Sequence, residues 1–415
     1  MTEAREGQGQ GQKLRIAYLL QQFPLPTETF AVSDIAALLA QGHHVSVFTM
    51  KRTRPDEQAR LKKSGVPECL PIDRLSLAGA MKWPALLWRF RRTVPVLLGA
   101  VLRGAGRHPK TAVEALLCIP RVLEIGDHIA RSDFDVVHAF WARHVGLVLP
   151  LMQATGTPAL RSAFAGAYDL VADDFLVDAT LGATQAAFSH AEVNRAYLER
   201  KTDPANVAII RRGIPLPEFG DEEQRDSYTW MTASSLIRHK NVEGVMRAFA
   251  VAREREPKLK LRVFGEGPDR PRLERLAREL GCADAVTFGG HVRRDELFAE
   301  MQRASAFLLL STGEWERLPN VLKEALWAGC AVISSSSPGI EELIPGEGIG
   351  HVVDPRDAGA AARAVEAMLG YSPEELAERR RRARDHVAEH FSSDQAMRCY
   401  AETWLSKRRS RGSAA

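Results

Sequence analysis

The sequence predicts an α/β protein made of two doubly wound, parallel-sheet domains. Its 415 residues are enough for two or three domains. Short apolar runs of strand length alternate with helical segments along most of the chain, which is the pattern of parallel sheets covered by helices. Around residues 213–226, proline, glycine and charged residues replace this alternation. We therefore place a linker between the two domains at residues 219–228.

The first domain is predicted to span residues 13–218, after a polar lead-in at residues 1–12 that is expected to be disordered. It opens with a strand at Arg15–Leu20, a helix at 33–40 and a second strand at 45–50. Further strands are expected at residues 135–140, 159–164, 183–189 and 207–210. Parallel strands joined by helices form a doubly wound sheet.

The second domain is predicted at residues 229–391 and repeats the alternation. Helices are expected at 242–251 and 270–280. Strands are expected at 230–234, 260–264, 285–288, 306–310, 331–334 and 350–353. A last helix at 392–407 and a basic tail at 408–415 complete the chain.

The composition indicates a globular protein of a reducing compartment. Apolar residues make up 45% of the chain, which is enough for two buried cores. The five cysteines are scattered without pairs at metal-ligand spacing, so neither a metal site nor a disulfide scaffold is expected. No signal peptide is recognisable, and no apolar run reaches the roughly 20 residues that span a bilayer. The predicted location is the cytoplasm.

A basic and apolar segment lies at residues 82–113. It contains seven lysines or arginines and no acidic residue, mixed with tryptophan, phenylalanine, leucine and valine. Such a mixture suits helices that lie in the interface of an anionic membrane, here the inner face of the cell membrane. The alternative is a pair of ordinary amphipathic helices with solvated basic faces. Nucleic acid is not expected as a partner, because no nucleic-acid-binding motif accompanies the segment.

The most informative segment is 314–329, where Glu316 lies in a predicted loop and Glu324, eight positions later, on the helix that follows. Pro319 suits the first helical position and Gly329 the residue after the last. A helix start offers free N–H groups and the positive end of a dipole to an anion. Two carboxylates beside such a site suit a phosphorylated, polyhydroxylated ligand, such as a nucleotide sugar. Alternatively, both are ordinary solvated carboxylates.

This segment resembles the Glu-x7-Glu motif of the retaining glycosyltransferases of family 4, and most closely the exopolysaccharide and colanic-acid type. The resemblance implies the GT-B fold, in which two Rossmann-like domains face a deep cleft and the last helix crosses back to the first domain. It also implies that Glu324 binds the donor ribose and that Glu316 contacts the transferred sugar. Donor contacts are assigned in the same way to Arg317, Leu318, Pro319 and Asn320.

Other donor-side residues follow from the same resemblance. Lys240 resembles the lysine that contacts the donor diphosphate, where a cation neutralises charge on the leaving group. The family's arginine five residues earlier is Ser235 here, so Arg238 is the substitute we expect. Gly265 and Gly267 resemble a Gly-x-Gly-Pro turn that permits close ligand approach. Val292 lies in the segment whose backbone touches the nucleobase.

The acceptor side is predicted in the first domain. Thr27, Glu28 and Thr29 resemble a Ser-Glu-Thr-Phe segment of exopolysaccharide-type members. Asp169 fits a His-x-x-Asp region of the family, although Gly166 stands at the histidine position. His138, near the end of a predicted strand, is either an acceptor contact or a structural histidine.

Arg317 stands where the family usually has glycine. It is either a solvent-facing side chain or a partner for a uronic-acid donor or the diphosphate.

The predicted function is therefore retaining, metal-independent transfer of a sugar from a nucleotide-diphosphate sugar to a hydroxyl of a glycan or lipid-linked acceptor, with no cofactor. Surface polysaccharide or glycolipid assembly is the expected setting. One alternative is a degenerate nucleotide-sugar-binding protein without catalysis, because Ser235, Gly166 and Arg317 depart from the family pattern. The other is a sugar-nucleotide epimerase of the same fold.

Overall fold

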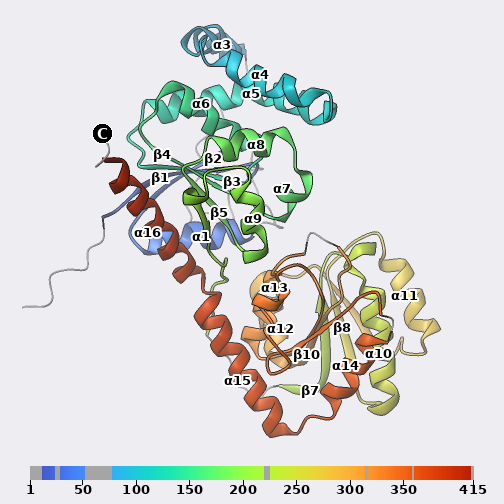
Figure 1. The fold of residues 1–415 in the computed structure, drawn as a ribbon. Helices are drawn as coiled ribbons and strands as arrows, with labels where there is room; N and C mark the ends of the chain where they lie inside the picture. Colours follow the sequence, from blue (N-terminus) through green and yellow to red (C-terminus); the bar gives the residue numbers. More distant parts are fainter. Residues whose placement is uncertain are drawn as a thin grey trace, which may run out of the picture. The chain divides into compact units, whose positions relative to one another are not determined.

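The computed structural model describes residues 12–23, 29–51, 77–218, 225–313, 316–357 and 359–412. The chain forms two compact units, drawn in Figure 1. Unit 1 comprises residues 1–211 and 393–415, and unit 2 comprises residues 212–392. The division thus falls a few residues before the predicted one at 218. Most of the predicted linker lies outside the described residues, and residues 226–228 already belong to the first strand of unit 2.

Unit 1 contains a six-stranded sheet in which every neighbouring pair is parallel, in the order β2-β1-β3-β4-β5-β6. The strands appear in the sequence as short apolar runs, because a parallel sheet is buried on both faces. Its strands are β1 (Arg15–Leu20), β2 (His44–Thr49), β3 (Val136–Phe140), β4 (Leu160–Phe164), β5 (Ala186–Ser189) and β6 (Val207–Ile209).

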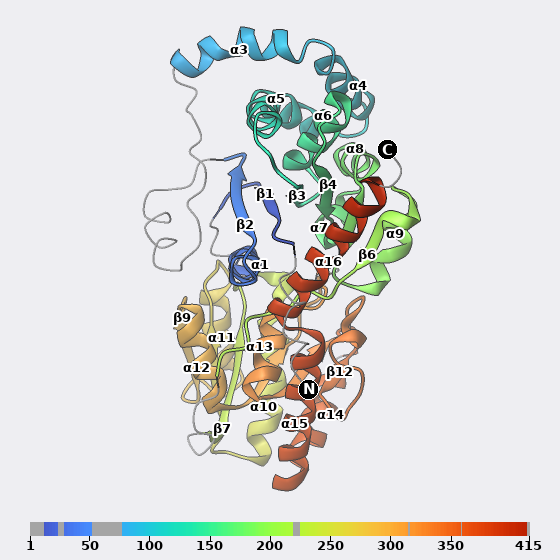
Figure 2. The same ribbon diagram turned by 90° about the vertical axis from the view of Figure 1, so that its left-hand side faces the viewer.

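Helices cover both faces of this sheet (Figure 1). Figures 1 and 2 also show α3 outside α5 when seen from the sheet, at the rim of unit 1. The helices are α1 (Thr29–Ala40), α3 (Leu77–Arg89), α4 (Val94–Ala105), α5 (Pro109–Ala130), α6 (Val148–Thr155), α7 (Ala167–Ala172), α8 (Phe175–Gly182) and α9 (Arg195–Glu199).

The last helix, α16 (Ser393–Gly412), returns to unit 1 and packs on α1. Its Tyr400 and Trp404 are buried in the core of that unit. The helix continues through residues 408–412, which the sequence predicted as a tail. Ion pairing explains the extra turn, because Arg408 lies 2.7 Å from the carboxylate of Asp135 and cations are favourable at a helix C-terminus.

Unit 2 contains a second six-stranded, all-parallel sheet in the order β12-β11-β10-β7-β8-β9. Its strands are β7 (Asp226–Ala233), β8 (Lys260–Phe264), β9 (Val286–Gly290), β10 (Ala304–Leu309), β11 (Ala331–Ser335) and β12 (His351–Val353). Its helices are α10 (Val242–Arg255), α11 (Arg270–Glu279), α12 (Arg294–Arg303), α13 (Asn320–Ala328), α14 (Ala360–Leu369) and α15 (Pro373–His390).

Each sheet has one place where the strand order reverses. In unit 1 it lies between β1 and β3, and in unit 2 between β7 and β10. The loops after the two strands at such a point leave toward opposite faces, so a crevice opens at the carboxyl edge, where open α/β sheets bind their ligands. The loops after β7 and β10 are therefore the place to look for a site in unit 2.

Candidate functional site

The loops that follow β7 and β10 are joined by hydrogen bonds at this reversal. The backbone N–H of Thr312 donates to the carbonyl of His239 at 2.8 Å. The side-chain amide of Asn241 donates to the carbonyl of Leu310 at 2.9 Å, while its oxygen accepts from the N–H of Gly244 at the start of α10. These bonds hold the two loops in a fixed relation before any ligand binds.

Lys240 and Glu316, both predicted as catalytic residues, form an ion pair between these loops. Lys240 ends a short 3-10 turn, Arg238–Lys240, and Glu316 belongs to the loop before α13. Their side chains are only 19% and 20% exposed. The alternative in which Glu316 is a solvated loop charge is therefore wrong. The pair places a cation and a carboxylate together at the edge where a ligand is expected.

Glu324 on α13 pairs with Arg294, the first residue of α12. The Arg294 atoms Nη2 and Nε lie 2.6 and 2.7 Å from Oε1 of Glu324. The Glu324 side chain is 13% exposed, so it is not a freely solvated carboxylate either. The sequence reasoning missed Arg294, although it directly follows the segment assigned to the nucleobase. The predicted ribose-binding carboxylate thus has a fixed guanidinium beside it.

The start of α13 is shaped by a residue with left-handed backbone. Leu318 has φ +50° and its side chain is 2% exposed, so burial of the leucine holds the loop in a conformation that L-residues rarely adopt. Pro319 is the residue before the helix and not its first residue, one position earlier than predicted. Gly329 ends the helix with φ +85°, as the sequence predicted. Arg317 lies beside Glu316 and is partly buried.

Lys323 is a buried lysine that the sequence reasoning did not single out. It is 1% exposed, and its ammonium donates to the carbonyl of Arg212 at 2.7 Å and to Oδ1 of Asn320 at 3.0 Å. It also lies 5.3 Å from the centre of the Phe391 ring. Arg212 begins unit 2 and Phe391 stands near its end, so Lys323 ties α13 to both ends of the unit. The side-chain oxygen of Asn320 is committed to this contact.

Arg238 is not brought to the Lys240–Glu316 pair. Its side chain is 75% exposed, and its Nε lies 3.6 Å from Asp269, a carboxylate that is also 3.0 Å from Arg272. The structure therefore does not place Arg238 beside Lys240 and Glu316, and its role as the substitute for the missing family arginine stays a prediction. Of the two predicted diphosphate cations, Lys240 alone stands in the cluster.

Glycine is needed at positions 265 and 267 because another loop packs closely against them, which the sequence did not reveal. A Cβ atom at Gly265 would overlap the carbonyl of Ser234, and one at Gly267 would overlap the carbonyl of Leu236. The loop after β8 is bonded to the loop after β7, because Leu236 N–H donates to the Glu266 carbonyl at 2.9 Å. The glycines thus admit a neighbouring backbone. Val292 is partly exposed in the turn between β9 and α12, and its backbone contact with a base stays a prediction.

The predicted acceptor residues of unit 1 are either outside the described residues or buried. Thr27 and Glu28 lie outside the described residues, and Thr29 is the first residue of α1, with a side chain that is not described. His138 and Asp169 are each 1% exposed. Their burial favours the structural alternative for His138, and the acceptor role of both residues stays a prediction.

His138 is a structural histidine because β3 is buried on both faces. Its Nδ1 lies 2.8 Å from the hydroxyl of Ser162, and that hydroxyl accepts a hydrogen bond from the indole N–H of Trp404 at 2.9 Å. The rings of Tyr400 and Trp404 pack against it at 5.7 and 5.4 Å. The histidine therefore fastens α16 to the sheet.

We expect His138→Ala to lower the free energy of unfolding by about 2–4 kcal/mol, because it leaves a cavity in the core. Urea unfolding followed by circular dichroism measures the change. Affinity for nucleoside diphosphates should stay the same, since the donor residues lie in unit 2. A variant of unchanged stability that binds its acceptor more weakly would restore the acceptor role.

Asp169 caps the short helix α7. Its Oδ2 accepts from the backbone N–H of Gly166 at 2.9 Å. Burial raises the pKa of this carboxyl to about 7, and this outweighs the opposing bonds from the backbone of Gly166 and Ala142 and the charge of Arg143. Below about pH 7 the carboxyl of Asp169 is therefore mostly protonated in the folded protein.

Because folding raises the pKa of Asp169, the buried protonated carboxyl contributes to the free energy of unfolding. This contribution is fully present below about pH 4, the ordinary pKa of an aspartate, and is lost as the pH rises through about 7. Asp169→Asn cannot titrate, so the variant should gain stability relative to the wild type between pH 5 and pH 8. Urea unfolding at both pH values measures the difference, and all other titrating groups cancel in it. Parallel pH profiles for the two proteins would contradict the prediction.

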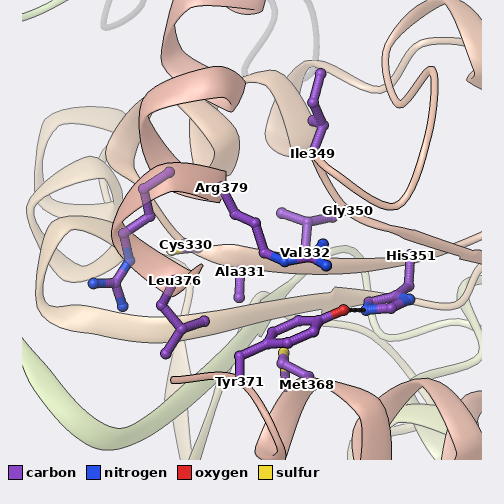
Figure 3. A pocket seen from close by; sticks show the side chains of 11 residues that line it. Cys330, Ala331, Val332, Ile349, Gly350, His351, Met368, Tyr371, Leu376 and Arg379 are labelled. Carbon is purple, nitrogen blue, oxygen red and sulfur yellow. Dashed lines mark hydrogen bonds between the residues drawn. The ribbon is translucent and has the colours of Figure 1, made fainter. Parts of the chain in front are cut away.

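A small cavity at the opposite edge of the unit 2 sheet is shown in Figure 3. It lies beside the starts of β11 and β12 and has a volume of about 20 Å³. His351 Nε2 lies 2.6 Å from the Tyr371 hydroxyl, and the Arg379 guanidinium stacks on the tyrosine ring at 3.8 Å. A space of this size holds about one water molecule, so it is a packing gap and not a donor site.

Two further properties concern only the part of the chain that the structure describes. None of its helices is both long and apolar enough to cross a membrane. Its histidine, cysteine and acidic side chains form no group of three or more that is placed to hold a metal ion.

Comparison with known proteins agrees with this geometry. Residues 219–386 match the family model described as glycosyl transferases group 1. The matched segment covers most of unit 2. WcaL, which is named as a colanic acid biosynthesis glycosyltransferase, is similar in two organisms. The Escherichia coli K12 protein is 28% identical over 45% of this chain and 48% of its own length. The Salmonella typhimurium protein is 23% identical over 91% of this chain and 96% of its own.

A third relative is the GDP-mannose-dependent alpha-(1-6)-phosphatidylinositol monomannoside mannosyltransferase of Mycobacterium tuberculosis H37Rv. It is 33% identical over 41% of this chain and 43% of its own length. Among solved structures, Anabaena Alr3699/HepE in complex with UDP has a TM-score of 0.69 at 14% identity, covering 95% of this chain and 100% of that one. The predicted GT-B class of fold is thereby confirmed.

Proposed function

We propose that this chain is a retaining glycosyltransferase that moves a sugar from a nucleotide-diphosphate sugar to a hydroxyl acceptor without a metal ion or cofactor. The observation that carries the proposal is the Lys240–Glu316 pair, which lies at the strand-order reversal of a group 1 glycosyltransferase domain. Glu324 and the start of α13 stand on the loop and helix that follow. Together they supply a cation, two carboxylates and the positive end of a helix dipole.

The reaction needs no dedicated protein base. The bond between the anomeric carbon and the diphosphate oxygen breaks as the acceptor oxygen bonds to the same face of that carbon. The acceptor proton passes to the departing phosphate oxygen, so atoms and charges balance. Lys240 neutralises the negative charge that grows on the diphosphate. Glu316 releases Lys240 to the donor and orients the sugar hydroxyls, while Glu324 binds the ribose beside Arg294.

The test begins with the donor. Relatives are named for different nucleotides, GDP in one and UDP in another, so both should be tried with several sugars. A bound donor should raise the melting temperature by mass action, and slow hydrolysis of the sugar should follow. Proton NMR of the first sugar released then reports whether the anomeric configuration is retained. Inversion would overturn the retaining mechanism, and failure of every nucleotide to bind would overturn the function.

A second candidate is a nucleotide-sugar-binding protein without catalysis. Two observations favour it: Arg238 turns toward Asp269, and Gly166 replaces the histidine of the family pattern. Such a protein would show the rise in melting temperature but neither hydrolysis nor transfer. The same experiment therefore separates the two functions.

We also propose that the helices of residues 82–113 contact an anionic membrane on its cytoplasmic face. Several large apolar side chains are exposed there, among them Trp88 at 68% and Leu102 at 67%. Arg91 and Arg92 are exposed beside them, and the Arg91 guanidinium lies 4.5 Å from the centre of the Trp88 ring. An aromatic ring with a basic neighbour is suited to the headgroup layer. Ordinary solvated helices would not expose so many large apolar groups together.

We expect the protein to sediment with vesicles that contain phosphatidylglycerol and not with pure phosphatidylcholine. The double variant Arg91→Glu, Arg92→Glu should lower the partition coefficient at least about tenfold, since each basic residue near such a surface contributes about 1 kcal/mol. Trp88→Ala should also weaken binding. Val193→Ala, an apolar residue 49% exposed elsewhere in unit 1, is the matched control. Equal sedimentation of all variants would contradict the proposal.

A further inference from the structure

Trp141 has an unusual backbone at the carboxyl edge of the unit 1 sheet. It directly follows β3, one of the two strands at the strand-order reversal of that sheet. Its φ is +81°, which bulky L-residues almost never adopt. Such a conformation costs on the order of 1–3 kcal/mol and persists only where the surroundings enforce it, most often at functional sites. The structure around Trp141 shows what enforces it.

Gly166 lies in the loop after the neighbouring strand, β4, and approaches Trp141 closely. A Cβ atom at this position would lie 2.5 Å from Cζ3 of the Trp141 indole. The indole therefore occupies the space that any side chain at position 166 would need. The glycine that departs from the family pattern therefore makes room for the strained tryptophan. The indole stands where the family resemblance leads one to expect an imidazole.

Several aromatic rings pack around the indole of Trp141. The rings of Phe140, Phe164 and Phe30 lie 5.1, 5.7 and 6.0 Å from it. The ring of Tyr168 lies 6.1 Å from the indole and is nearly perpendicular to it, at 88°. Tyr168 is 63% exposed and Trp141 is partly exposed. We call these two residues the aromatic ledge.

The ledge is held rigidly. The backbone N–H of Gly166 donates to the buried carboxyl of Asp169, which fixes the turn that carries Tyr168. Two positions beyond Trp141, the Arg143 guanidinium lies 2.8 Å from the buried Asp174. Both segments that build the ledge are therefore anchored by buried aspartate side chains. A preformed ledge binds a ligand without the cost of ordering its own side chains.

We propose that the aromatic ledge is a stacking subsite for a pyranose ring of the acceptor. The C–H groups on one face of a pyranose are apolar and pack on an aromatic face, while its hydroxyls stay in water or bond to the Tyr168 hydroxyl. The donor residues Lys240, Glu316 and Glu324 all belong to unit 2, so a saccharide subsite in unit 1 falls to the acceptor. This inference rests on the proposed function, because it assigns the acceptor of that reaction.

The experiment uses octyl glycosides of glucose, galactose and mannose as probes of the full-length protein. Saturation-transfer difference NMR should show binding of at least one of them, with the strongest transfer to ring protons on the apolar face. Tyr168→Ala should weaken that binding at least tenfold, and Tyr168→Phe should retain most of it. Val171→Ala, on the same helix and 40% exposed, is the matched control and should bind like the wild type.

A second variant tests the indole itself. Gly166→Ala should displace Trp141 and weaken glycoside binding as much as Tyr168→Ala does. Nucleotide binding and donor hydrolysis, measured on the same variants, should be unchanged. If the wild type binds no glycoside, or if Tyr168→Ala and Gly166→Ala bind as well as the wild type, the subsite is overturned. If the wild type binds glycosides but no nucleotide, the subsite stands and the proposed function fails.

Discussion

Replacing Lys240 by alanine is expected to lower kcat for sugar transfer about 10²–10³-fold, the usual loss when one group that stabilises transition-state charge is removed. The reason is its position. Its ammonium pairs with Glu316 at the strand-order reversal of unit 2, where the diphosphate is proposed to lie. In the ground state the diphosphate keeps its other contacts, so the KM for the donor should change much less than kcat. Steady-state kinetics with the donor identified by thermal shift measures both.

Arg238→Ala is the matched control for that experiment. The two cations lie in the same turn, but the Arg238 side chain is 75% exposed and its neighbour is Asp269. Its loss should change kcat only a few-fold, since exposed ion pairs contribute about 1 kcal/mol or less. Equal losses for the two variants would show that Arg238 moves to the diphosphate when the donor binds. An Arg238→Ala loss larger than that of Lys240→Ala would reverse the assignment of the two residues.

The sheets were predictable because parallel strands have a simple signal. A strand buried on both faces is a short apolar run, and the predicted bounds of β1 and β8 agree with the structure to the residue. The same burial explains why His138 is enclosed in the core. In a strand with two buried faces, a polar residue near the end does not by itself mark the exposed edge. Ser162 and Trp404 give this histidine its partners, and neither is near it in sequence.

The site was predictable to the extent that its residues share a short segment. Glu316, Glu324 and Gly329 lie on one loop and helix, so spacing was enough to place them. Arg294 was missed because it pairs with Glu324 from another helix. Leu318 gives no sign of its positive φ, since leucine is not a residue that favours it. Contacts between distant loops are set by the sheet order, which the apolar pattern does not reveal.

Lys323 shows the same limit most clearly. A lysine on a predicted helix is expected to be exposed, because lysine is almost never fully buried unless it is paired. Here a backbone carbonyl, a side-chain amide and an aromatic ring, from three different segments, surround the ammonium. Two of those segments, at Arg212 and Phe391, are also joined directly, because the N–H of Ile214 donates to the Phe391 carbonyl at 2.8 Å. Lys323 therefore stabilises the place where the chain enters and leaves unit 2.

Lys323→Ala is accordingly expected to lower the free energy of unfolding of unit 2 by about 3 kcal/mol, because it leaves both a cavity and unpaired polar groups. Lys323→Met keeps the length of the side chain and loses only the hydrogen bonds, so about 1–2 kcal/mol should be lost. Lys258→Ala, an exposed lysine of the same unit, should change little. Urea unfolding followed by tryptophan fluorescence measures all three.

Nucleotide affinity shows whether Lys323 supports donor binding as well as the stability of unit 2. Glu324 is its neighbour on α13, and Asn320 accepts its hydrogen bond, so a loosened helix start should weaken donor binding as well as stability. Lys323→Met should then bind nucleoside diphosphates several-fold more weakly at a temperature where it is fully folded. Unchanged affinity in a destabilised variant would confine Lys323 to the framework of unit 2. Unchanged stability in Lys323→Ala would contradict the burial on which both expectations rest.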